Sequence, residues 1–152
     1  MRYHSGGQAP ILHYQATNQN WQRRNPTCFP LAAMTIAAER SAAELVLRPG
    51  DMLVLLSDGI FEYHNDAGEM FGEQRVMELV ADCRDLPLSE TAARLMDAVK
   101  RFANGAPQED DITILLLKRA TGNSAIKQSF SRKIASLAEI FTLPPSPHSA
   151  FR

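Results

Sequence analysis

The sequence has few cysteines, little net charge and no long apolar run. Its two cysteines, Cys28 and Cys83, lack the paired spacing of a zinc site or a disulfide framework. With 16 Lys and Arg against 17 Asp and Glu, the net charge of -1 creates no field that would attract nucleic acid or an anionic membrane. No apolar run approaches the roughly 20 residues of a membrane span, and the first residues lack the apolar core of a signal peptide. We therefore expect a cytoplasmic protein with reduced thiols and with no nucleic-acid or membrane partner.

What remains is an ordinary globular composition. The chain has 152 residues, of which 45% are hydrophobic and 22% charged, enough for a domain with its own core. Over the first fifty residues, short apolar stretches alternate with turn residues, a pattern that predicts short strands. The predicted strands are 11–14, 29–36 and 44–47, with a polar stretch over 15–25.

The tetrapeptide RPGD, residues 48–51, predicts a turn between two strands. Pro at its second position and Gly at its third suit type II geometry, because the third position requires a positive φ. We therefore expect a hairpin between 45–47 and the apolar segment 52–56.

A second turn is expected at NDAG, residues 65–68, which would place 61–63 against 69–71. Helical spacing of apolar residues then begins. It runs through 76–83 and again through 92–103, which predicts two amphipathic helices.

Capping residues bound the second of these helices. Ser89 is its expected N-cap, and Asn104 with Gly105 its expected C-terminal stop. Three acids then run into the apolar segment 112–117, which is another buried-strand candidate. The predicted order is strands, two helices and a strand.

The tail from residue 120 has a different character. Apolar residues could form one side of a short amphipathic helix: Phe130, Ile134, Leu137, Ala138 and Phe141. The segment TLPPSPHSAFR after it is broken by proline. We expect a linker helix and a disordered end over 120–152.

Acidic residues stand at the ends of two predicted buried strands. Asp58 follows 52–56, whereas Asp110 and Asp111 precede 112–117. If these strands are antiparallel neighbours, about 5 Å apart, their acids converge on one rim of the sheet. Carboxylates that converge need a positive partner, and hard oxygen donors suit Mg²⁺ or Mn²⁺.

Gly59 would allow a hydrated ion or a substrate to approach the backbone beside Asp58. A plainer reading stands beside this one. Asp-Gly is a common turn signal, and acids before a strand are often solvated or bound to backbone amides. Two or three acids also fall short of a two-metal site, which needs a bridging carboxylate and further oxygen ligands. Spacing alone leaves both readings open.

Four segments, in order, resemble a known family. They are SGGQAPIL (5–12), FPLAAM (29–34), LRPGDMLVLLSDGIFEYHNDAGEMFGEQR (47–75) and DDITILLLKR (110–119), with the helix pair between the last two. Together they resemble the C-terminal part of the PPM-type, or type 2C, metal-dependent protein serine/threonine phosphatases of bacteria, typified by stage II sporulation protein E. On this resemblance we identify residues 1–119 as the C-terminal part of such a domain.

The resemblance implies an α+β fold, an α-β-β-α sandwich of mainly antiparallel sheets flanked by helices. It implies a centre of two Mn²⁺ or Mg²⁺ ions, where metal-activated water hydrolyses phosphoserine or phosphothreonine of a regulatory protein. Asp58 and Asp110 match the family's metal-binding catalytic aspartates, and Asp111 is a further candidate metal ligand. Gly59 and Thr113 match positions that shape the site or meet the substrate.

The resemblance also implies partners in bacterial signal transduction and stress response. The expected substrate is a phosphorylated anti-anti-sigma-like protein. The tail segment SFSRKIASLAEIF, residues 129–141, looks like the connector that joins some family members to an anti-sigma kinase domain. We therefore expect such a kinase domain as a fused or separate partner.

The sequence departs from the family pattern near its start. Glu39 is the only acid in the first 43 residues, so the family's early aspartates have no counterpart. Gly7 and Ala9 stand where the family usually has His and Pro. We expect a truncated domain, a separately encoded half or a degenerate member, with weak metal binding as an isolated chain. The alternative is a non-catalytic interaction module with a degenerate phosphatase fold.

Overall fold

The computed structural model describes residues 1–7, 10–28, 30, 42–121 and 138–143. Its elements in chain order are β1 (Arg2–Tyr3), β2 (Ile11–Gln15), β3 (Asn20–Arg24), β4 (Ala43–Glu44), β5 (Met52–Leu56), α1 (Asp58–Phe61), α2 (Gly72–Asp82), α3 (Leu88–Ala103), β6 (Ile112–Lys118) and β7 (Ala138–Leu143). None of the helices in these ranges is long and apolar enough to cross a membrane.

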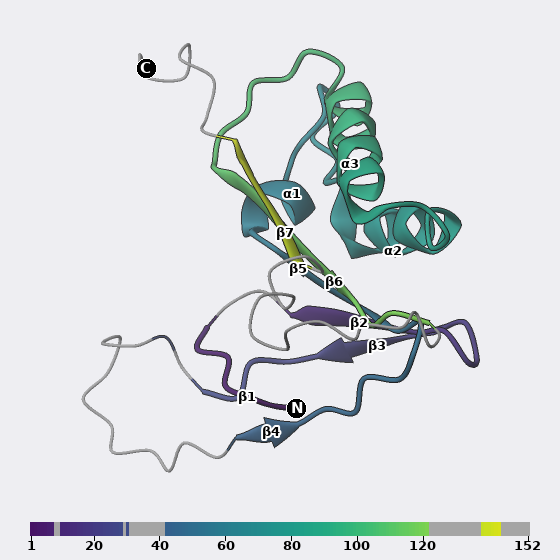
Figure 1. The fold of residues 1–152 in the computed structure, drawn as a ribbon. Coiled ribbons are helices and arrows are strands. Elements are labelled where there is room, and N and C mark those ends of the chain that lie inside the picture. The colour runs from purple at the N-terminus through teal and green to yellow at the C-terminus, as the bar shows by residue number, and fades with distance from the viewer. Residues whose placement is uncertain (8–9, 29, 31–41, 122–137, 144–152) are drawn as a thin grey trace.

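The described strands form two antiparallel sheets. A five-stranded sheet has the order β3-β2-β5-β6-β7, and β1 pairs with β4 in a two-stranded sheet. Helices α2 and α3 cover one face of the larger sheet, and β1 and β4 lie on its other side (Figure 1). This arrangement confirms the predicted α+β class with antiparallel sheets flanked by helices.

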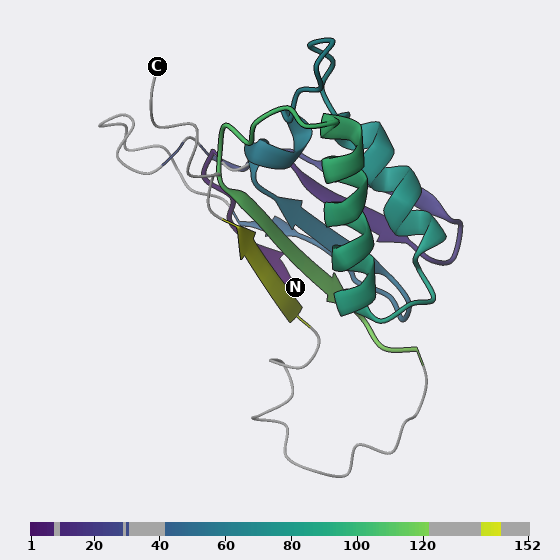
Figure 2. The same cartoon turned by 90° about the horizontal axis from the view of Figure 1, so that it is seen from above.

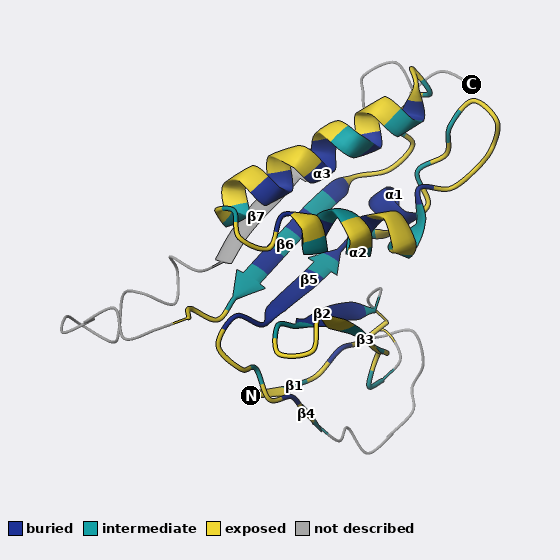
Figure 3. Ribbon diagram, turned by 90° about the vertical axis from the view of Figure 1, so that its right-hand side faces the viewer, coloured by how far each residue is buried: buried dark blue, intermediate teal, exposed yellow. Residues whose placement is uncertain are grey.

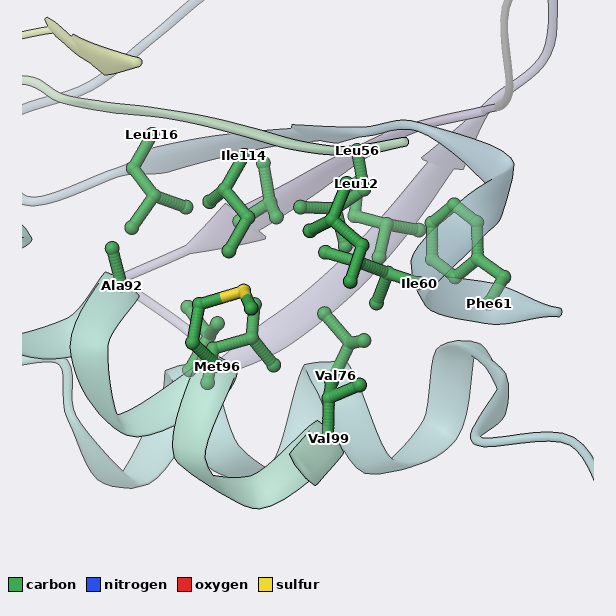
Figure 4. Close-up of a cluster of buried hydrophobic side chains, with 14 of the residues drawn as sticks. Leu12, Leu56, Ile60, Phe61, Val76, Ala92, Met96, Val99, Ile114 and Leu116 are labelled. Carbon is green, nitrogen blue, oxygen red and sulfur yellow. The ribbon is translucent and has the colours of Figure 1, made fainter. Parts of the chain in front are cut away.

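The main core lies between the larger sheet and the two long helices. Strand β6 alternates buried and half-buried residues, and Ile112, Ile114 and Leu116 belong to this core. Figure 4 shows Ile114 and Leu116 on the side of the sheet that meets Met96 and Val99 of α3. The outward faces of both helices stay exposed (Figure 3), as the helical spacing in the sequence predicts.

A smaller core covers the opposite face of the sheet. Ile11 of β2 and Leu53 of β5 pack there with Leu45, which follows β4. Strand β5 is therefore buried on both faces, which explains its nearly unbroken apolar sequence.

Both long helices are confirmed, with a correction at the start of α3. The expected N-cap Ser89 lies inside the helix. Pro87 is the N-cap instead, with a φ of -57°, and the first helical residue is Leu88. The C-terminal stop is as predicted, with Asn104 at φ 50° and Gly105 at φ 95°.

The turn at residues 48–51 forms, but the predicted hairpin does not. The Asp51 N–H donates to the Arg48 carbonyl at 2.9 Å, and Gly50 has φ 88°, as a type II turn requires. Strand β5 nevertheless pairs with β2 and β6, and residues 45–47 form no strand. Two longer apolar strands offer β5 more pairing than the short segment before the turn.

Two other N-terminal predictions need correction. Strand β3 lies within the polar stretch 15–25, for which no strand was predicted. It is an edge strand whose side chains are exposed or half-buried, so it carries no apolar signal apart from Trp21. The predicted strand 44–47 is reduced to the short β4, and the predicted strand 29–36 lies outside the described residues apart from Pro30.

The turn at residues 65–68 is confirmed. The Gly68 N–H donates to the Asn65 carbonyl at 2.9 Å, and the Phe71 N–H donates to the Tyr63 carbonyl at 2.9 Å. The segment before it differs from the prediction, because Phe61 ends the short helix α1 rather than lying in a strand.

The predicted tail helix is wrong where the structure describes it. Ala138 and Phe141 lie in β7, which pairs with β6. The backbone groups on the edge of β6 supply tertiary hydrogen bonds that local helical periodicity cannot anticipate. Phe130, Ile134 and Leu137 lie outside the described residues, as do residues 144–152.

A buried carboxylate joins the turn at residues 48–51 to β2. Asp51 is only 1% exposed and accepts hydrogen bonds from the Arg48 N–H at 2.8 Å and the Ala16 N–H at 2.9 Å. His13 Nε2 lies 3.1 Å from its Oδ2. Burial raises the pKa of Asp51, but these hydrogen bonds and the attraction to His13 outweigh it and lower the pKa below the usual value.

We predict that Asp51→Asn lowers the free energy of unfolding by about 1.5–3 kcal/mol at neutral pH, because an amide cannot replace the charged acceptor. The lowered pKa means that the unfolded state binds the proton more readily. The carboxylate therefore stabilises the fold above about pH 4, and this contribution is lost as the pH falls through the folded pKa.

Urea denaturation at pH 7 and at successively lower pH measures both effects. Part of the acid destabilisation seen in the parent chain should disappear in the variant. The exposed Asp97→Asn is the control and should change neither quantity. Equal stability of the Asp51 and Asp97 variants would contradict the assigned role.

Candidate active site at the rim of the sheet

The pairing of β5 with β6 brings the predicted acids to one rim. The strands are antiparallel, with Leu56 opposite Ile114, and the Ser57 N–H donates to the Thr113 carbonyl at 3.1 Å. The end of β5 thus lies beside the start of β6, as expected. Asp58 and Asp110 follow and precede these strands, and both side chains are exposed.

Ser57 joins the two strand ends through its side chain. Its hydroxyl donates to the Asp111 carbonyl at 2.8 Å and accepts from the Thr113 N–H at 2.9 Å. The Ser57 side chain thereby links the end of β5, next to Asp58, to the backbone of Asp111, next to Asp110. The sequence analysis did not assign Ser57 this role, although its position beside Asp58 was a usable signal.

Gly59 is required by the close approach of the segment before β6. A Cβ atom at this position would lie 2.5 Å from the backbone oxygen of Asp111, a contact that real Cβ atoms do not show. Gly59 therefore lets the first turn of α1 pack against the backbone of the second acidic segment. The space at its Cβ position is taken by the Asp111 backbone, whereas the sequence predicted that Gly59 makes room for a hydrated ion or a substrate.

A cavity of about 520 Å³ opens at this rim. It is lined by Asp58, Gly59, Glu62, Tyr63, His64, Asn65, Asp66, Ala106, Pro107, Glu109 and Asp110. The cavity brings together three of the predicted site residues, Asp58, Gly59 and Asp110. Asp111 and Thr113 are not among its lining residues and meet the site through their backbone contacts with Ser57.

The cavity lining is strongly acidic. It has the carboxylates of Asp58, Glu62, Asp66, Glu109 and Asp110 and contains no Lys or Arg. Asp58 Oδ1 accepts from the Gly59 N–H at 3.2 Å, and Asp110 Oδ1 accepts from the Asp111 N–H at 2.7 Å. The backbone thus orients both carboxylates that the sequence analysis selected. Glu62 and Glu109 were not selected, because they match no motif.

Tyr63 forms a hydrogen bond between the hairpin at residues 63–71 and the loop that precedes Asp110. Its hydroxyl donates to the Ala106 carbonyl at 3.1 Å. Burial, together with the charge of Glu109, raises the pKa of Tyr63, so the hydroxyl keeps its proton. The sequence analysis missed this contact as well, since it joins segments that are distant in the chain.

The donor set suits one side of a site for a hard divalent cation. Asp58 and Asp110 offer the oxygen ligands that Mg²⁺ and Mn²⁺ prefer, and the described residues that line the cavity include no Lys or Arg. Within the described ranges, however, no three His, Cys, Asp or Glu residues lie close enough to hold a metal ion. The fit is therefore to part of a coordination shell.

The model of the stage II sporulation protein E (SpoIIE) family matches residues 1–120, which is most of the chain. The chain belongs to the SpoIIE family. The SpoIIE match contains every element that builds the cavity and ends shortly after β6. Among curated proteins, none matches the chain.

Similarity to a solved structure supports a partial PP2C-type fold, and a second structure is less similar. The SiaA-PP2C domain of Pseudomonas aeruginosa has a TM-score of 0.60 and 23% identity over 73% of this chain and 43% of that one. The phosphatase domain of SpoIIE from Bacillus subtilis, presoaked with Mn, has a TM-score of 0.49 and 22% identity over 76% and 49%. The chain therefore spans less than half the length of either structure.

We predict that Ser57→Ala lowers the free energy of unfolding by about 0.5–1.5 kcal/mol, because one exposed and one partly buried hydrogen bond between the two strand ends are lost. Thermal or urea denaturation measures this change. Ser89→Ala is the matched control, since Ser89 is exposed and lies within α3. A Ser57 variant as stable as the Ser89 variant would rule out the assigned link.

We also predict that Gly59→Ala separates the two strand ends, at a cost of about 1–3 kcal/mol. Amide chemical shifts in an NMR spectrum should move at residues 110–112, because the added methyl group would meet the backbone of Asp110 and Asp111. Ser89→Ala, at an exposed position of α3, is the comparison and should leave these shifts unchanged. Unmoved shifts at residues 110–112 in the Gly59 variant would show that the close contact is absent.

Proposed function

We propose that this chain forms part of a metal-dependent protein serine/threonine phosphatase in bacterial signal transduction. The observation that carries the proposal is the convergence of Asp58 and Asp110, from two adjacent strands, on one acidic cavity of a SpoIIE-family fold. Family membership favours phosphate-ester hydrolysis over other uses of such a cavity.

The charge of the cavity favours a cation-dependent reaction. A phosphorylated side chain carries about -1.5 to -2 charges at neutral pH. Two unit charges 5 Å apart repel by roughly 3 kcal/mol at an effective dielectric constant of 20. Five carboxylates with no Lys or Arg would therefore exclude a phosphoryl group unless cations neutralised them.

Asp58 and Asp110 are the residues that would hold Mn²⁺ or Mg²⁺, and Asp111 is the alternative ligand. When bound, such ions activate water and neutralise phosphoryl charge. The chain supplies rigid placement: Ser57 ties the two acidic segments together, and Gly59 allows their close packing. Gly59 and Thr113 would shape the surface that the phosphorylated residue meets.

The remaining ligands would come from outside this chain. The chain spans 43% of the SiaA-PP2C domain. The described residues of this chain contain no group of three His, Cys, Asp or Glu side chains that could hold a metal ion. We therefore propose that two-metal binding and full turnover need a longer protein or a second polypeptide.

We propose a phosphorylated anti-anti-sigma-like protein as the substrate, in the cytoplasm, with an anti-sigma kinase domain as a fused or separate partner. The support is the resemblance to bacterial regulatory phosphatases in the ordered motifs between residues 5 and 119.

Phosphatase assays with Mn²⁺ on a phosphoserine protein test the proposal. They should use this chain and a longer protein in which family sequence precedes it. We expect activity in the longer protein that chelation with EDTA abolishes. Asp58→Asn and Asp110→Asn should each lower kcat/KM by about 100-fold or more, because each removes a ligand charge.

The exposed Asp97→Asn on α3 is the matched control and should retain the activity. Asp111→Asn tests the alternative ligand, and a larger loss there than in Asp110→Asn would exchange their roles. An inactive longer protein, or one unaffected by Asp58→Asn, would refute the phosphatase proposal.

A second candidate is a non-catalytic module that binds a phosphoprotein or a kinase domain without turnover. The early aspartates of the family are absent from the first 43 residues, where Glu39 is the only acid. Such a module would keep its partner after chelation and after Asp110→Asn. Metal-dependent binding would count against it.

A further inference from the structure

A separate cavity of about 330 Å³ lies between β2, β3 and the segment 44–48 that leads to β5. Its lining includes Gln15 of β2, Gln22 and Arg24 of β3, and Arg48 and Asp51 of the turn before β5. It shares no lining residue with the acidic cavity of the candidate active site. The chemistry of this cavity is therefore a question of its own.

The alternation of side chains along β3 places Gln22 and Arg24 in this cavity. Trp21 packs against the main core, and Arg23 Nε lies 3.1 Å from Glu73 of α2, so both side chains face the helices. Gln22 and Arg24 therefore point to the opposite side of the sheet, where β1 and β4 lie (Figure 1). Strand β3 forms the edge of this sheet opposite to β7 (Figure 2).

Arg24 has a buried donor that lacks an acceptor. Its Nη2 donates to Gln22 Oε1, but its Nε–H is buried and has no hydrogen-bond partner among the described residues. Buried donors in proteins are nearly always satisfied by another protein group, by water or by an ion. The Nε–H group therefore indicates that the cavity accommodates an acceptor.

The glutamines of the cavity also offer donors. Gln22 Oε1 accepts from Arg24, and Gln15 Oε1 accepts from Asn18 Nδ2 at 3.3 Å. Because both side-chain oxygens are engaged, the NH₂ groups are what these glutamines can offer to a ligand. A ligand rich in acceptors suits this arrangement.

The unpaired charge of the cavity is positive. Neither Arg24 nor Arg48 forms an ion pair with a carboxylate of the described residues. The two acids of the lining have partners of their own, since Glu44 lies 4.0 Å from Arg2 and Asp51 accepts hydrogen bonds from two backbone amides. Guanidinium groups bind carboxylates and phosphates through charge-assisted hydrogen bonds.

We propose that this cavity is a binding site for a small oxyanion, whose carboxylate or phosphate group accepts hydrogen bonds from Arg24 and Arg48. The cavity volume of about 330 Å³ far exceeds the share of one water molecule, about 30 Å³, so a small organic anion fits. The site lies apart from the acidic cavity and does not depend on phosphatase activity.

NMR titrations of the full-length chain with sodium phosphate and with sodium succinate test the proposal. Divalent cations are left out, and sodium chloride keeps the ionic strength constant. We expect saturable shifts of the Arg24 Nε–H and of the Gln15 and Gln22 side-chain amides with at least one anion. The anion that saturates them identifies the ligand group as phosphate or carboxylate. The absence of saturable shifts with both anions would overturn the proposal.

Arg24→Gln should weaken the binding of that anion by about tenfold or more, because a charged hydrogen-bond donor is lost. Arg23→Gln is the matched control, since it removes the same charge from the next residue of β3 on the face toward α2. It should change the affinity by less than about twofold. Equal losses in the two variants would show that the anion responds to surface charge in general and would contradict the site.

Arg48→Gln decides the case if Arg24→Gln does not fold. The Arg48 residue is exposed, and its backbone N–H still donates to Asp51 in the variant, so the turn keeps its anchor. We expect anion binding to weaken by about fivefold or more. Unchanged affinity in the folded Arg48 variant would remove this residue from the site and overturn the proposal.

Discussion

The antiparallel pairing of β5 with β6 is the interaction on which the rest of the structure depends. It joins two strongly apolar strands along all of β5 and most of β6, from Met52 opposite Lys118 to Leu56 opposite Ile114. One face of the pair supports α2 and α3, and β5 also packs against the smaller core on the other face. The same pairing sets the distance between the acidic segments, which Ser57 then fixes with two hydrogen bonds. The core and the candidate active site thus share one register.

The carboxylates at the two ends of β5 differ in their burial. Asp58 and Asp110 stand just beyond the apolar strands and are exposed to water. Asp51 is buried, and it is stabilised by two backbone amides and by His13. Strands behind exposed acids would suit the proposed cation site, whereas the buried acid holds the turn that precedes β5. The charges are therefore separated by role as well as by position.

The edge of the main sheet at β6 lies next to the candidate active site. Strand β6 carries one acidic segment at its start, and its outer neighbour is β7, from outside the family region. The chain spans 43% of the related SiaA-PP2C domain, so most of that domain has no counterpart here. The end of β7 lies near Asp110, because Leu143 is opposite Ile112.

Local sequence by itself determined the two long helices, the turns at residues 48–51 and 65–68, and the apolar strands β5 and β6. Helical spacing, turn glycines and apolar runs act over a few residues, so they can be read along the chain. It also determined that acids stand at the ends of β5 and β6. Only the tertiary structure decided that β5 pairs with β2 rather than with residues 45–47, and that Ala138–Leu143 is a strand. It also selected Asp110 over Asp111 for the cavity and revealed Ser57 and Tyr63 as links. These outcomes depend on hydrogen bonds between segments that are distant in the sequence, and no local pattern predicts which segments pair.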